Sequence, residues 1–170
     1  TLIGATKYVE TADIITARDL GLKEVGDNKV QEFRDKTSLI DGLDKHFIGR
    51  LQKNKVKYLI GKVALIQSVD SISLAEEISK QSQKAGVTTN VLLEVNTGEE
   101  QKGGFPLDEV ENAVKTISEM PNISVKGLMA MFPLDADDNQ CAKIWLQIRG
   151  VYDTMINSGY DFKHLSIGMS

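Results

Sequence analysis

The sequence predicts one α/β domain, folded as a (β/α)8 barrel of the TIM type that lacks its last βα unit in this chain. Seven short apolar segments alternate strictly with six helical patterns, and helical crossovers impose parallel strands with right-handed connections. Each unit takes about 20 to 35 residues, a spacing that suits a barrel. No glycine-rich turn of the dinucleotide-binding type follows a strand, which disfavours an open doubly wound sheet. We therefore expect a single domain over residues 1–170, incomplete at both ends.

The predicted strands are short runs of apolar residues bounded by polar residues and glycine. The segment 90–95 is the clearest, because its apolar run is typical of a parallel strand that is covered on both faces. The expected strands cover residues 1–7, 23–26, 45–49, 63–69, 90–95, 124–129 and 164–167.

The predicted helices are recognised by their caps and by apolar residues at helical spacing. Ser71 is the expected N-cap of a helix that ends at Gly86. Asp27 or Asn28 is expected to cap the helix over 29–37. Further helices are expected over 12–20, 50–60 and 138–157, and another ends before Pro121 and carries the strongest stripe, at Val110, Ala113, Val114 and Ile117.

The composition narrows the class of protein. With 41% hydrophobic and 26% charged residues, the chain has ordinary soluble globular composition, and its net charge of −4 argues against nucleic-acid binding. No run approaches the ~18 apolar residues of a membrane span, and nothing resembles a signal peptide. Cys141 is the only cysteine, so we expect no intrachain disulfide and a cytoplasmic location. Two histidines and one cysteine make a transition-metal site improbable.

The residues that follow the strands are the first candidates for a site, because all βα loops of a barrel open on one face. This set is rich in amides, small residues and lysine, and it lacks the paired acids of a glycosidase or a magnesium site. A lysine among neutral amides suits carbonyl chemistry or an anion held by backbone N–H groups. The candidates are Lys7, Asn28, Gly49, Gln52, Asn54, Asn96, Lys102, Met129, Met131, Gly168, Met169 and Ser170.

Five motifs occur in order at the predicted βα junctions. They span residues 4–7, 26–32, 46–55, 127–131 and 165–170, and the third reads His-Phe-Ile-Gly-Arg-Leu-Gln-Lys-Asn-Lys. Together they resemble the pyridoxal phosphate homeostasis proteins, single-domain barrels similar to the amino-terminal domain of alanine racemase. The likeness covers essentially the whole chain, and the pattern His-Phe-Ile-Gly-x-Leu-Gln-x-Asn-Lys is highly specific. The family's last strand, with an Arg-x-Gly segment that completes the phosphate site, and its helix before the first strand are absent from this sequence.

The resemblance implies a covalently held cofactor. Lys7 would carry pyridoxal 5′-phosphate (PLP) as a Schiff base, and burial at the barrel mouth would favour the neutral, nucleophilic form of its amine. Ser166, Gly168 and Met169 would hold the phosphate through a hydroxyl and backbone N–H groups. Lys102 would approach the cofactor from the loop after the fifth strand.

The resemblance gives three further residues a place around the cofactor. Asn28 and His46 would line the cup, and Met129 would lie near the ring. Structural alternatives stay open, because Asn28 could cap a helix, His46 could be a hydrogen-bonded core histidine and Met129 could simply pack the rim. Lys102 could equally be a solvated loop charge.

Three functions are compatible with these residues. The first is a monomeric carrier that buffers PLP and delivers it to PLP-dependent apoenzymes without robust catalysis of its own. The second is a PLP-dependent amino-acid racemase or lyase. A related racemase needs a second base, usually a tyrosine from another domain or subunit, and this chain is too short to contain that domain. The third is a Schiff-base aldolase that acts on a phosphorylated sugar.

Overall fold

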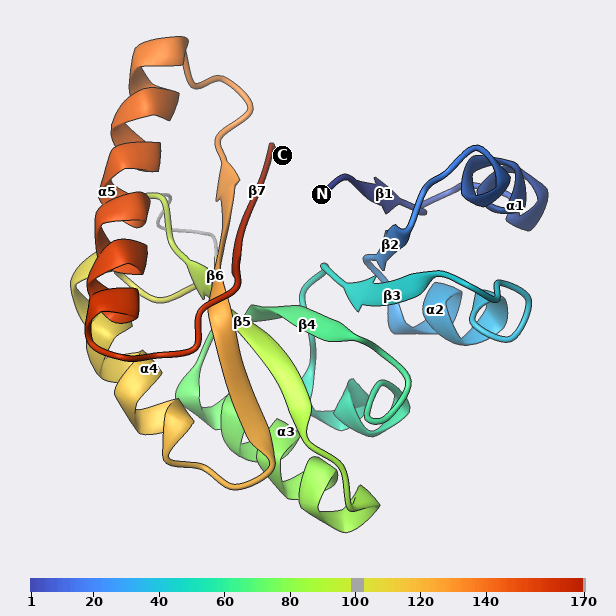
Figure 1. Cartoon of the computed structure of the whole chain (residues 1–170), viewed down its shortest axis with the longest axis horizontal. Coiled ribbons are helices and arrows are strands. Elements are labelled where there is room, and N and C mark those ends of the chain that lie inside the picture. The colour runs from blue at the N-terminus through green and yellow to red at the C-terminus, as the bar shows by residue number, and fades with distance from the viewer. Residues whose placement is uncertain (99–102, 170) are drawn as a thin grey trace.

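The computed structural model describes residues 1–98 and 103–169, whose seven strands form one parallel sheet in sequence order. The sheet curls into a half-barrel with β1 and β7 at its edges, and the helices lie along its outer side (Figure 1). This arrangement confirms the predicted fold class. The strands are β1 (Ile3–Ala5), β2 (Glu24–Asp27), β3 (Asp44–Phe47), β4 (Leu65–Val69), β5 (Thr89–Val95), β6 (Ile123–Phe132) and β7 (His164–Met169).

The described residues form five α-helices and two 3₁₀ segments. None of these helices is both long and apolar enough to cross a membrane. The helices are α1 (Thr11–Asp19), α2 (Val30–Lys36), α3 (Ile72–Ala85), α4 (Val110–Ser118) and α5 (Asp138–Asn157), and the 3₁₀ segments are η1 (Lys53–Tyr58) and η2 (Leu107–Glu109).

Several predicted bounds differ from the structure, among them those of the segment 50–60 and the end of the sixth strand. The segment 50–60 is not an α-helix, because only η1 forms there. Val56 and Leu59 are both buried, and a 3₁₀ turn with three residues per turn places residues of this spacing on one face. Strand β6 runs on to Phe132, so Met131 lies within the strand and not in the loop after it.

The predicted caps hold for α3 and fail for α2. Ser71 accepts a hydrogen bond from the backbone N–H of Leu74, and Gly86 ends α3 with φ of 66°. The N-cap of α2 is Lys29, without a side-chain cap, so neither Asp27 nor Asn28 fills this role. Asp27 instead accepts a hydrogen bond from the buried Thr6 hydroxyl at 2.6 Å. Burial raises the pKa of the Asp27 carboxyl, and the bond from Thr6 opposes this rise.

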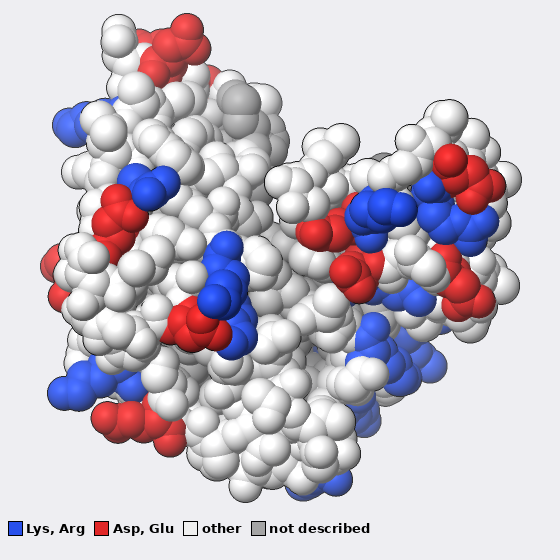
Figure 2. All heavy atoms as spheres, viewed as in Figure 1, with Lys and Arg blue, Asp and Glu red and all other residues white. Residues whose placement is uncertain are grey.

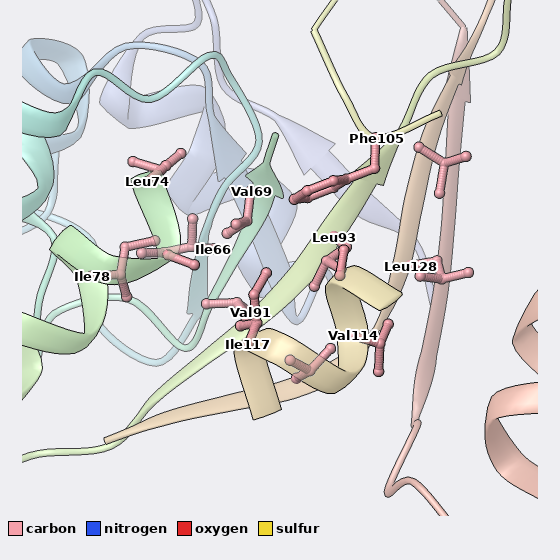
Figure 3. Packing of buried hydrophobic residues seen from close by; sticks show 14 of the residues in the cluster. Ile66, Val69, Leu74, Ile78, Val91, Leu93, Phe105, Val114, Ile117 and Leu128 are labelled. Carbon is pink, nitrogen blue, oxygen red and sulfur yellow. The ribbon is translucent and has the colours of Figure 1, made fainter. Parts of the chain in front are cut away.

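The main core lies between the outer face of the sheet and its helices. Ile66, Val91 and Leu93 of the sheet pack with residues of α3 and α4 such as Ile78 and Ile117 (Figure 3). Alternate strand residues point to the opposite face, where Leu65, Leu92 and Met129 form a smaller cluster with Met131. Strand β5 is therefore covered on both faces, as its apolar run predicted.

Gly127 permits a bulge in β6 that sets the register with β5. Val91 pairs with Val125 and Leu93 with Leu128, so β6 contains one residue more than β5 over this stretch. Gly127 has φ of +146°, and a Cβ atom there would lie 1.8 Å from the carbonyl oxygen of His164 on β7. Only glycine therefore allows β7 to approach β6 this closely.

Gly127→Ala is expected to destabilise the protein by at least about 2 kcal/mol, because the new methyl group clashes with backbone and the positive φ is strained. The free energy of unfolding in urea measures this loss. Gly150→Ala in α5 is the matched control, since a Cβ at this position has nothing within 4 Å, and it should stabilise the helix by about 0.5–1 kcal/mol. Equal stability of the two variants would contradict the assignment.

Candidate cofactor site

A cavity of about 690 Å³ lies on the concave side of the sheet and reaches both of its edges. Its volume is in the usual range of small-molecule sites. Its walls include residues that follow β2 and β3 and the last residues of β7, at the end of the sheet where barrels of this kind place their sites, together with the start of the chain and β1. The residues that line it include Ile3, Ala5, Asn28, Gly49, Arg50, Gln67, Met129, Met131, Ser166 and Gly168.

A chain of polar side chains crosses the interior of the half-barrel beside this cavity. The Ser166 hydroxyl donates to Oε1 of Gln67 at 2.7 Å, and Nε2 of Gln67 lies 2.7 Å from Nδ1 of His46. The other ring nitrogen of His46 lies 3.6 Å from a carboxylate oxygen of Glu24. Because Gln67 accepts through its oxygen, its amide nitrogen is free to donate to His46. Four strands, β2, β3, β4 and β7, are thus joined through their inward-facing side chains.

His46 is held as a neutral imidazole within this chain. It is buried, and Nδ1 can accept the bond from Gln67 only when that nitrogen carries no proton. Burial lowers the pKa of His46 below its ordinary value of 6.5, and the carboxylates of Glu24 and Asp44 oppose this shift. His46 is not among the residues that line the cavity. Its position fits the hydrogen-bonded core histidine more closely than a cup-lining residue.

Asn28 is positioned by backbone packing against Gly49. A Cβ atom at Gly49 would lie 2.1 Å from the carbonyl oxygen of Asn28, so a larger residue cannot occupy this position without displacing it. The carbonyl of Gly49 accepts a buried hydrogen bond from the Ser68 hydroxyl at 2.6 Å. Asn28 and Gly49 both line the cavity, so β2 and β3 end together at one wall.

Lys7 lies in a turn just beyond β1, and its side chain is exposed. The carbonyl of Thr6 accepts from the N–H of Val9 at 3.1 Å and from Nζ of Lys36 at 2.9 Å, which fixes the turn. Tyr8 has φ of 61°, and Nζ of Lys7 lies 5.0 Å from the centre of its ring. The expected burial of the Lys7 amine at the barrel mouth is therefore wrong for this conformation, because the strand ends at Ala5 and the turn carries the side chain outward.

Of the other predicted residues, three line the cavity, and two cannot be placed from the described side chains. Met129, Ser166 and Gly168 line the cavity with Asn28. Met169 is the last residue of β7 and pairs with Phe132, but its side chain is not described. Lys102 lies outside the described residues, so its implied approach to the cofactor stays a prediction.

Sequence reasoning missed Gln67 and Arg50. Gln67 is an amide within the largely apolar strand Leu65–Val69, beside Ser68, and is 2% exposed. A buried amide in such a strand needs polar partners, and this signal could have identified it. Arg50 occupies a variable position of the third motif, so the resemblance gave it no role, yet it lines the cavity.

Comparison with known proteins places the chain in a family. The family model for the alanine racemase N-terminal domain matches residues 10–170. The pyridoxal phosphate homeostasis protein of Aquifex aeolicus is 41% identical over 173 residues, which cover 99% of this chain and 76% of that protein. The chain belongs to the pyridoxal phosphate homeostasis protein family. The family member of Helicobacter pylori is 35% identical over 150 residues, covering 85% of this chain and 66% of its own length.

Solved structures support the fold of this family member. PipY of Synechococcus elongatus, solved with PLP bound, matches with a TM-score of 0.88 and 22% identity, covering 99% of this chain and 89% of PipY. At 22% identity this likeness supports the fold alone. The half-barrel of this chain therefore has the architecture of a protein whose structure contains PLP.

The neutral state of His46 predicts how stability depends on pH. A histidine with a lowered pKa in the folded state binds its proton more readily when unfolded, so folding stability falls as the pH drops below about 6.5. The loss of unfolding free energy between about pH 7.5 and about pH 5.5 should be smaller in His46→Asn than in the unmodified protein. Urea unfolding at both pH values measures it. Identical losses in the two proteins would show that His46 does not contribute.

Proposed function

We propose that this chain binds PLP in the cavity between β1 and β7 and holds it as a Schiff base to Lys7. In this proposal the single domain over residues 1–170 is a monomeric, cytoplasmic carrier that keeps PLP available and delivers it to PLP-dependent apoenzymes, without robust catalysis of its own. The observation that carries the proposal is the cavity itself, which lies beside the strand that leads to Lys7. Membership of the family supports the same role.

The residues around the cavity fit a phosphorylated, planar ligand. Asn28 offers an amide, and the backbone N–H groups of 168 and 169 at the end of β7 would form an anion cradle. The Ser166 hydroxyl donates to Gln67 in this conformation and would join the cradle by exchanging that bond for one to the phosphate. A Cβ atom at Gly168 would lie 2.8 Å from the sulfur of Met131, so glycine leaves room that a side chain would fill. Met129 and Met131 supply polarizable, apolar walls for a ring.

In the proposed bound state, Lys7 would enter this cavity by continuing the alternation of β1. Ile3 and Ala5 both line the cavity. Residues two positions apart in a strand point to the same face, so Lys7 would follow Ile3 and Ala5. Thr6 points the other way, to Asp27. We infer that the exposed Lys7 side chain turns inward when PLP binds, while Thr6 and Lys36 keep the end of β1 in place.

The tyrosines support the carrier over the racemase. None of the four tyrosines lines the cavity in the described part of the chain. Tyr152 packs against Phe162 in the outer core, and Tyr58 lies beside Arg34 on the outside of the sheet. Tyr8 is next to Lys7 but is 77% exposed, so none of these tyrosines stands opposite the lysine in the described part of the chain.

Lys7→Ala should abolish the absorption band that PLP acquires when it forms a Schiff base with the protein. The amine is the only atom of this side chain that can react with the aldehyde. Lys23→Ala, which removes another exposed lysine, is the control and should keep the band. Borohydride reduction followed by mass spectrometry of peptides should place the adduct on Lys7. An adduct on a different lysine, or an unchanged band in Lys7→Ala, would refute the assignment.

The racemase alternative makes a separate prediction about rate. The PLP-loaded, full-length protein should racemise alanine and serine far more slowly than ~1 s⁻¹, the low end of common enzymatic turnover. Chiral chromatography of the amino acids measures this. Turnover above that value, lost in Lys7→Ala, would establish an enzyme in place of the carrier.

A further inference from the structure

A second cavity of about 750 Å³ lies next to the candidate cofactor site, between the carboxyl-terminal ends of β2–β4 and the starts of α2, η1 and α3. We call it the basic groove. Its cationic side chains are Lys29, Arg50, Lys53 and Lys55, and among the described residues that line it Asp70 carries the only carboxylate. Figure 2 shows lysine and arginine side chains gathered over the region of α2 and η1. The groove is thus strongly cationic in a chain whose net charge is −4.

Most of these cations lack an acidic partner among the residues that the structure describes. Lys29 lies 3.3 Å from Glu32. Within residues 1–98 and 103–169, Arg50, Lys53 and Lys55 form no ion pair. Three unpaired cations at one concave surface create a positive potential that attracts small anions and raises their local concentration.

Arg50 connects the basic groove to the cofactor cavity. It lines both, as does Asn28, and it also lines a smaller cavity beside Met129 and Met131. The contact between Asn28 and Gly49 forms the shared wall. A guanidinium at this junction can bind a phosphate through two parallel hydrogen bonds, and lysines add point charges around it.

We propose that the basic groove is a reversible, non-covalent site for phosphate monoesters, through which PLP passes between solvent and the Lys7 cavity. This proposal rests on the proposed function. Lys53 and Lys55 attract the phosphate dianion, and Arg50 transfers it from the groove to the cavity that it also lines. The groove is separate from the phosphate cradle at the end of β7, and its ligand class is any compact phosphate monoester.

The rate at which PLP forms its absorption band tests this route. In stopped-flow mixing of the full-length protein, K53Q/K55Q should lower the association rate of PLP roughly tenfold at low salt and weaken its salt dependence. Pyridoxal, which has no phosphate, should react at the same rate with the variant and with the unmodified protein. K80Q/K84Q removes the same charge from exposed positions of α3 outside the groove and should leave the PLP rate unchanged.

Binding of inorganic phosphate separates this proposal from the proposed function. In Lys7→Ala, which cannot form the Schiff base, phosphate should still bind, and Lys7→Ala combined with K53Q/K55Q should bind it at least about fivefold more weakly by titration with ³¹P NMR. Equal phosphate affinity in Lys7→Ala and in Lys7→Ala combined with K53Q/K55Q would refute the phosphate site in the groove. Equal PLP rates in K53Q/K55Q and K80Q/K84Q would refute it as well. Absence of any PLP band in the unmodified protein overturns the proposed function, and the phosphate titration still decides on the groove.

Discussion

The hydrogen bond from Ser166 to Gln67 constrains the curvature of the half-barrel from its concave side. Its partners are 99 positions apart, on β7 and β4, which are not neighbours in the sheet. It therefore spans the concave side directly, and the bond between Gln67 and His46 extends it to β3. Buried amides and imidazoles left without partners cost about 1–3 kcal/mol each, so flattening the sheet is penalised at several points together. Curvature is thus fixed by polar groups inside and by apolar packing outside.

Alternate strand residues point to opposite faces of the sheet, so the residues that form the core differ from those that line the cavity. Outward-facing residues such as Ile66 and Leu93 are fully buried against helices, and they provide most of the apolar burial. The inward-facing residues Leu65 and Leu92 form an apolar cluster, and further along the strands the inner face is polar at Gln67 and Ser166. The cavity lies where the inner face changes from apolar to polar. Ligand contacts can therefore vary there without loss of the outer core.

The sequence predicted the fold well because each strand and helix is defined by local pattern, as the stripe beginning at Val110 and the cap at Ser71 illustrate. The resemblance to the family implied places near the cofactor for Met129 and Ser166, and both line the cavity. Features set by contacts between distant segments were missed. Gln67 matters through strands β3 and β7, and the outward position of Lys7 follows from a turn that Lys36 of α2 stabilises. Local pattern does not encode either contact.

The exposure of Lys7 has a direct consequence for the proposed carrier. A covalent link to a buried lysine is protected from water and from competing amines, which suits an enzyme that keeps its cofactor. In the proposed carrier Lys7 turns inward when PLP binds, and the exposed position that the turn otherwise gives this side chain is the one in which the link can exchange with amines of another protein. The basic groove lies at the same end of the sheet and shares Arg50 with the cavity. In the proposed carrier, the link to Lys7 and the contacts to the phosphate are therefore separate, so that each would be broken in its own step when the cofactor leaves.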